Sequence, residues 1–106
     1  MSERIRGLLR ELKRALHQLY GERLQGVYLY GSYARGEEDN ESDVDVLVVL
    51  DKIPSYGSEV DRTSPLVSAL ALKYAVSISR VFISQEQWGH GQTIFLTNAR
   101  EEAVPA

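Results

Sequence analysis

The eight residues from Asp43 to Leu50 constrain the fold more than any other part of the chain. They read Asp-Val-Asp-Val-Leu-Val-Val-Leu, and apart from the two aspartates both alternating faces are apolar. A strand that is apolar on both faces must be covered on both, which predicts a central strand of a sheet. Side chains alternate along a strand, so Asp43 and Asp45 should point to the same face. Two adjacent carboxylates repel unless one is protonated or a divalent cation lies between them.

A glycine–serine turn precedes this strand. Gly31 and Ser32 follow the apolar run Val27–Tyr30 and begin the string Gly-Ser-Tyr-Ala-Arg-Gly. A tight turn that brings backbone amides near a phosphate, next to a cation site, is what nucleoside triphosphate chemistry requires. The plain alternative is a pair of solvated aspartates at a strand edge, but carboxylates that enter a buried strand need a reason to be there.

Hydrophobic spacing and capping residues predict the remaining elements. Ser32 is expected to cap a short helical turn. The helix near residue 58 would start only at Thr63 or Ser64 if Pro65 takes its first position. The order predicts an α+β fold with a small mixed sheet of three strands, or slightly more, and helices mainly on one side. The expected helices span 3–20, 58–75, 85–88 and 93–102, and the expected strands span 26–30, 43–50 and 76–83.

Length and composition narrow the class of protein. A chain of 106 residues is expected to form a single domain, 1–106. It has no cysteine, which excludes disulfides and thiolate chemistry and fits a cytoplasmic protein. No apolar run is long enough to span a membrane. The net charge of −3 argues against nucleic acid as a partner, and the basic residues of the first helix are interpreted as a solvated face.

Gly31-Ser32, ten residues, then Asp43-x-Asp45 resembles the signature of the DNA polymerase β-like nucleotidyltransferase superfamily. The fuller string is most similar to the minimal nucleotidyltransferases of bacteria and archaea, and it implies their palm-like fold. In that family Gly31 would let the backbone approach the triphosphate, and Ser32 would contact its terminal phosphates. Asp43 and Asp45 would be the catalytic carboxylates that hold Mg²⁺ or Mn²⁺. Arg35 would either contact phosphate or brace the loop through a salt bridge.

The third strand departs from the family pattern. The superfamily takes a third carboxylate from a later strand, expected here near residues 75–79, but residues 76–83 contain no acid. Ser77 and Ser79 cannot serve as a base near neutral pH. Three outcomes are open: Glu86 or an acid of loop 37–41 substitutes, catalysis is slow, or it is absent. Loss of a general base typically costs about 10²–10⁴-fold in rate.

Three functions follow from the resemblance. The first is Mg²⁺-dependent transfer of AMP from ATP to a hydroxyl of a small helical HEPN-type toxin, which would make the chain an antitoxin. The second is a weak or inactive module that binds nucleotide or partner and neutralises the partner by binding. The third is transfer to a small molecule or an RNA end, against which the net charge and size argue. The exposed edge of a small sheet would also permit a homo-oligomer.

Overall fold

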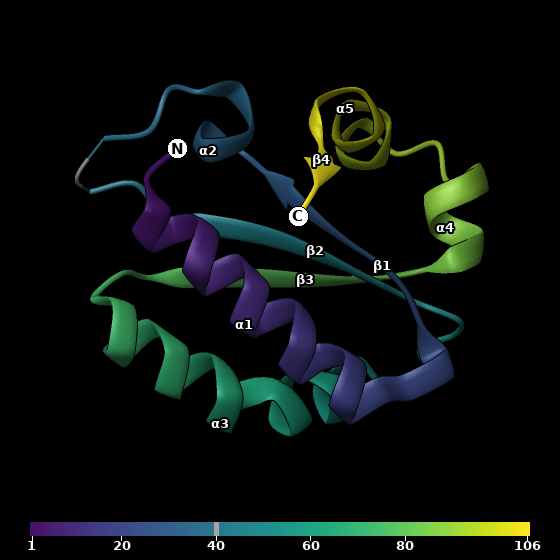
Figure 1. Ribbon diagram of the computed structural model, residues 1–106. Coiled ribbons are helices and arrows are strands. Elements are labelled where there is room, and N and C mark those ends of the chain that lie inside the picture. The colour runs from purple at the N-terminus through teal and green to yellow at the C-terminus, as the bar shows by residue number, and fades with distance from the viewer. Residues whose placement is uncertain (40) are drawn as a thin grey trace.

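The structure is a computed structural model that describes residues 1–39 and 41–106. Figure 1 shows the elements, whose order along the chain is α1, η1, β1, α2, β2, α3, β3, α4, α5 and β4. Of these, η1 is a 3₁₀ turn, the α elements are helices and the β elements are strands. The bounds are α1 Glu3–Tyr20, η1 Gly21–Arg23, β1 Leu24–Tyr30, α2 Ser32–Arg35, β2 Val44–Leu50, α3 Tyr56–Tyr74, β3 Ile78–Ser84, α4 Gln85–His90, α5 Ile94–Glu102 and β4 Val104–Pro105.

The sheet is mixed, with strand order β3-β2-β1-β4. Strand β2 pairs in parallel with β3 and antiparallel with β1, so the predicted central position of β2 and the predicted mixed sheet are confirmed. The fourth strand, β4, was not predicted; it runs antiparallel to β1 beside Tyr28 and Leu29. Two residues are too few to show alternation, and Pro105 is tolerated because edge positions need no backbone donor.

Helices cover both faces of the sheet unequally. The long helices α1 and α3 lie on one face, and the short helices α4 and α5 lie on the other (Figure 1). On the first face Val44, Val46 and Val48 of β2 join the main core, whereas Leu47 packs with Leu96 on the α5 face. The expectation of helices mainly on one side is thus confirmed for the two long helices. Asp45 is the one residue of β2 that is not fully buried.

Helix α3 does not start near Pro65, as the alternative prediction had it. It begins at Tyr56, and the hydroxyl of its N-cap Ser55 accepts the Ser58 N–H. Pro65 therefore lies inside the helix, where it removes one intrahelical hydrogen bond. Polar side chains gather at this point: Ser64 Oγ donates to the Val60 carbonyl at 2.7 Å, and Arg80 of β3 donates to the same carbonyl at 2.9 Å.

The other predicted elements are present with shifted ends. Strand β3 begins at Ile78 rather than at residue 76, and β1 begins two residues earlier than expected. Ser84 and Thr93 cap α4 and α5, and their hydroxyls accept the N–H of Gln87 and Leu96. Among the described residues there is no helix with the length and apolar character needed to cross a membrane.

Candidate active site

The turn after β1 has a backbone conformation that only glycine adopts readily. Gly31 has φ +74° and ψ −151°, and α2 starts at the next residue. A Cβ at Gly31 would overlap Oδ2 of Asp45 and lie 3.3 Å from its Cγ. The glycine thus lets the turn lie directly against the Asp45 carboxylate. The prediction that Ser32 caps the short helix is wrong: Gly31 is the N-cap, and no side chain makes a capping hydrogen bond.

Asp45 follows the buried Val44 in β2 and so lies on the opposite face of the sheet, the one that α5 covers, and Asp43 comes directly before the strand. The predicted shared face of the two aspartates stays a prediction, because β2 begins only at Val44, but the charge of Asp43 lies near enough to act on Asp45. Burial raises the pKa of Asp45, and the nearby charge of Asp43 raises it further, while Arg35 opposes the shift. The ionised pair is therefore unfavourable without a counter-charge, and a bound cation would relieve it.

Arg35 makes the salt bridge that was one of its two predicted roles. Its Nε lies 3.2 Å from Oε2 of Glu37, and its Nη1 lies 3.5 Å from Oε2 of Glu102. Glu37 is the main cause of the raised pKa of Arg35. Glu102, at the end of α5, was not singled out from the sequence, because no motif or spacing links it to Arg35. The guanidinium thus ties α2 to the last helix while its charge still acts on Asp45.

The register of β3 shows which of its residues lies beside Asp45. Asp45 pairs with Ser79 of β3, and residues paired in register share a face of the sheet. One step earlier, the Val44 N–H donates to the Ser77 carbonyl at 2.9 Å. Across the described part of the chain, no group of three His, Cys, Asp or Glu side chains is placed to hold a metal ion. The two aspartates are therefore flanked by serine, not by acid.

Glu86 lies far from this position along β3, and two of the loop acids, Glu37 and Asp39, make contacts elsewhere. Strand β3 ends at Ser84, which is five residues beyond Ser79 and so about 16 Å from it at the rise of a strand. Glu86 lies beyond that end, in α4. It lines a hollow with Asp51 and Lys52 at the far end of β2. In the loop, Glu37 binds Arg35, and Asp39 accepts the N–H of Glu41. Residue 40 lies outside the described residues.

Aromatic side chains fill the rest of the face that carries the aspartates. Tyr28 stacks on Trp88 with ring centroids 4.9 Å apart, and Tyr30 meets Phe95 edge to face at 5.6 Å. These contacts confirm that Tyr28 and Tyr30 share a face and pack together with Trp88 against α4 and α5. The aspartates lie at the end of this face, beside the Gly31 turn.

The combination of the glycine turn with two neighbouring carboxylates agrees with a comparison against known families. The family model described as "Nucleotidyltransferase domain" matches residues 9–94, which include the turn, both aspartates and β3. The chain belongs to this family. It is accordingly a member of an enzyme family, and the resemblance to minimal nucleotidyltransferases predicted from its motif is confirmed.

Individual relatives agree with this assignment. Protein adenylyltransferase MntA of Thermococcus cleftensis is 38% identical over 71 residues, which cover 67% of this chain and 70% of that protein. A Methanocaldococcus jannaschii protein, provisionally named a protein adenylyltransferase, is 36% identical over 74 residues, or 70% of this chain and 74% of the relative. A solved toxin–antitoxin structure with AMP-PNP has the same fold, with a TM-score of 0.59, 22% identity, and coverage of 96% of this chain and 68% of that one.

Proposed function

We propose that the chain transfers AMP from ATP to a hydroxyl group of a partner protein, and that it acts in this way as the antitoxin of a toxin–antitoxin pair. The observation that carries the proposal is the contact between the Gly31 turn and Asp45, beside Asp43. Two relatives are named protein adenylyltransferases, and a structural neighbour is a toxin–antitoxin assembly with an ATP analogue. The HEPN-type identity of the partner and the cytoplasmic location are part of the proposal.

The residues at the turn fit a divalent cation with a triphosphate. Asp43 and Asp45 would hold Mg²⁺ or Mn²⁺, because paired carboxylate oxygens are the ligands these ions prefer. The raised pKa of Asp45 supports this reading, since it marks negative charge that lacks compensation. When bound, the cation would neutralise phosphate charge and polarise the phosphoryl group. Gly31 would leave room for the phosphate chain, Ser32 would donate to it, and Arg35 would have to release Glu37 or Glu102 to contact it.

In the proposed reaction the acceptor oxygen forms a bond to the α-phosphorus of ATP. The bond from that phosphorus to the bridging oxygen breaks, and pyrophosphate leaves with the electron pair. The hydroxyl proton must pass to a base, and the described residues offer no third carboxylate beside Asp45 for this role. We therefore expect slow transfer, by roughly the 10²–10⁴-fold that a missing general base costs.

The place of Ser79 beside Asp45 favours a second candidate function. With only two carboxylates, the domain would still bind nucleotide or partner, and it would neutralise the partner by occlusion without chemistry. The two functions differ in what they require of Asp43. Transfer requires its carboxylate, whereas neutralisation by binding does not.

The first experiment is unfolding of the purified chain in denaturant, with and without ATP and Mg²⁺. A ligand that binds only the native state adds about 2.7 kcal/mol to the free energy of unfolding at 100 times its Kd. We expect this gain in the wild type and its loss in Asp43→Ala. No gain in the wild type at millimolar ATP and Mg²⁺ would refute the transferase function.

The second experiment uses a candidate helical partner protein and ATP labelled at the α-phosphate. Transfer predicts label on the partner and free pyrophosphate, both absent with Asp43→Ala. Neutralisation without label, retained in Asp43→Ala, would establish the binding module instead. Arg14→Ala, a substitution at an exposed position of α1, is the control: it should keep both the label on the partner and the neutralisation.

A further inference from the structure

The outer edge of β1 is only partly covered. Strand β4 pairs with Tyr28 and Leu29, and the Ala106 N–H donates to the Val27 carbonyl at 3.0 Å. No described strand pairs with the outer side of β1 between Leu24 and Gly26. An open edge leaves backbone N–H and C=O groups available to another extended chain.

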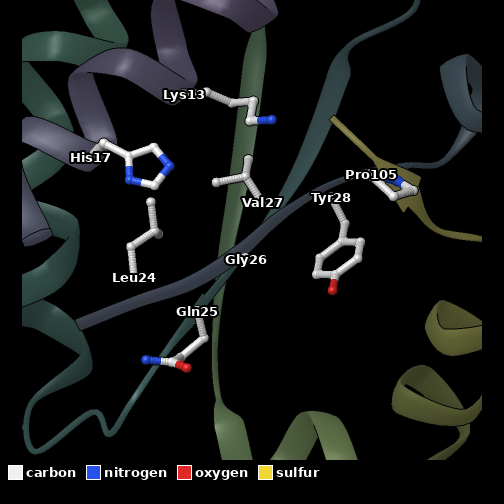
Figure 2. Close-up of a pocket in the computed structure, with 8 residues that line it drawn as sticks. All are labelled: Lys13, His17, Leu24, Gln25, Gly26, Val27, Tyr28 and Pro105. Carbon is white, nitrogen blue, oxygen red and sulfur yellow. The ribbon is translucent and has the colours of Figure 1, made fainter. Parts of the chain in front are cut away.

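A groove runs along this open edge, between β1 and α1. It encloses about 240 Å³ and is lined by residues 24–28, by Pro105 of β4, and by Lys13 and His17 of α1. Figure 2 shows Lys13 and His17 reaching from α1 on the same side of the strand as Leu24 and Val27. A second hollow continues past β4, shares Lys13 and Pro105, and adds Arg6 and Arg10 to its lining. The α1 wall of both hollows therefore carries basic side chains.

The basic side chains of this wall lie on one face of α1. Arg6, Arg10, Lys13 and His17 follow one another at intervals of three or four residues, which places them in a row along the helix. Arg6 is paired with Glu3 at 3.4 Å. In the described part of the chain Arg10, Lys13 and His17 take part in no ion pair. The predicted solvated face is confirmed for Arg6, Arg10 and His17, which are exposed, whereas Lys13 is half-buried and lies beside the open end of the β1 edge.

We propose that an extended, acidic segment of a partner protein docks in this groove as an added strand along β1. Backbone hydrogen bonds to residues 24–26 would supply affinity, and carboxylates facing Lys13 and its neighbours would select the segment. A second copy of the chain is disfavoured, because pairing the same edge would bring the two rows of cations together. Nucleic acid could use the cations but not the strand edge.

This surface is separate from the candidate active site. Leu24 pairs with Leu50, whereas Tyr30, at the other end of β1, pairs with Asp45. The docking of an acidic strand therefore needs neither aspartate, and it can be tested whatever the outcome for nucleotidyl transfer.

The test titrates a blocked peptide, Glu-Val-Glu-Val-Glu-Val-Glu, into the full chain labelled with ¹⁵N. We expect shifts of the amide signals of residues 24–27, abolished when the peptide's valines are N-methylated. Lys13→Glu should weaken binding about fivefold or more, which corresponds to about 1 kcal/mol. Arg14→Glu makes the same change of charge one residue away, off the groove lining, and should weaken binding less than about twofold.

Four results would overturn the proposal. The amides of residues 24–27 could stay unmoved at millimolar peptide, or a peptide with lysine in place of glutamate could bind equally well. A single-stranded oligonucleotide that displaced the acidic peptide and bound more tightly would identify nucleic acid as the occupant. Amide shifts at this edge that grow with protein concentration, with a dimer in sedimentation, would identify a second copy.

Discussion

Replacing Gly31 by alanine tests whether the turn and Asp45 form one site. The backbone there, φ +74° and ψ −151°, is a region that non-glycine residues occupy at a cost of about 1–3 kcal/mol. The added Cβ also overlaps Oδ2 of Asp45, 3.3 Å from its Cγ and 3.5 Å from its Cβ. Because the overlap is with the far end of that side chain, the carboxylate would rotate away and the fold would persist.

Gly36→Ala is the matched control. Gly36 also has a positive φ, +71°, but a Cβ there would meet nothing within 4 Å. Both substitutions should lower the free energy of unfolding by about 1–3 kcal/mol, well below the total of roughly 5–15 kcal/mol expected for a domain. They should differ in the additional stability from ATP and Mg²⁺. We expect this gain to disappear in Gly31→Ala and to remain near 2.7 kcal/mol, at 100 times Kd, in Gly36→Ala.

The assay is equilibrium unfolding in urea, monitored through Trp88, with and without ATP and Mg²⁺. An unchanged ligand-dependent gain in Gly31→Ala would refute the reasoning, since it would mean that ligand binding does not depend on the position of the Asp45 carboxylate. Equal loss of the ligand-dependent gain in both variants would refute the reasoning as well. Strain from any side chain at a positive φ in this loop would then be enough to abolish ligand binding.

Three further substitutions test the electrostatics. Asp45→Asn should stabilise the ligand-free chain at neutral pH, because a raised pKa means that folding disfavours the ionised form, and it should abolish the gain from ATP and Mg²⁺; urea unfolding measures both. Ser79→Asp should tighten Mn²⁺ binding, measured by calorimetry, whereas Ser68→Asp on the exposed side of α3 should not. Glu59→Gln should remove part of the acid sensitivity. Burial alone would raise the pKa of Glu59, but hydrogen bonds from Arg23 and Tyr20 lower it, so its stabilisation is present above the ordinary value of about 4.3 and is lost as pH falls through the lower folded value. Unfolding midpoints measured from pH 6 to pH 3 should therefore fall more steeply for the wild type.

The sequence predicted those parts of the fold that local patterns determine. Strand β2 was recognisable because both of its faces are apolar, and α1 because its buried residues follow helical spacing. Strand β4 was not, since two residues carry no period and their pairing depends on where α5 ends. The predicted helix 58–75 lies close to the observed α3, Tyr56–Tyr74, and only the alternative start at Thr63 or Ser64 was wrong, because it took Pro65 for the first position of the helix.

In the candidate site, too, the locally determined features could be predicted and those that depend on distant residues could not. The positions of Gly31, Asp43 and Asp45 could be predicted, since a turn and a strand fix them locally. The absence of an acid from the third strand was also visible, but only the parallel register shows that Ser79, not Ser77, pairs with Asp45. The salt bridge from Arg35 to Glu102 joins residues that are distant in the chain, and no local rule connects them.

A comparison of two carboxylates supports a functional role for Asp45. Glu59 is only 2% exposed, yet its pKa is lowered, because Tyr20 donates to it at 3.0 Å and Arg23 at 2.7 Å. The fold thus compensates a buried acid where that acid serves stability. The negative charge of Asp45 is not compensated in this way. Its pKa is raised, a second acid lies beside it, and Arg35 forms salt bridges with Glu37 and Glu102. Such an arrangement costs stability in the free chain, and it is accounted for if the missing positive charge arrives with the ligand.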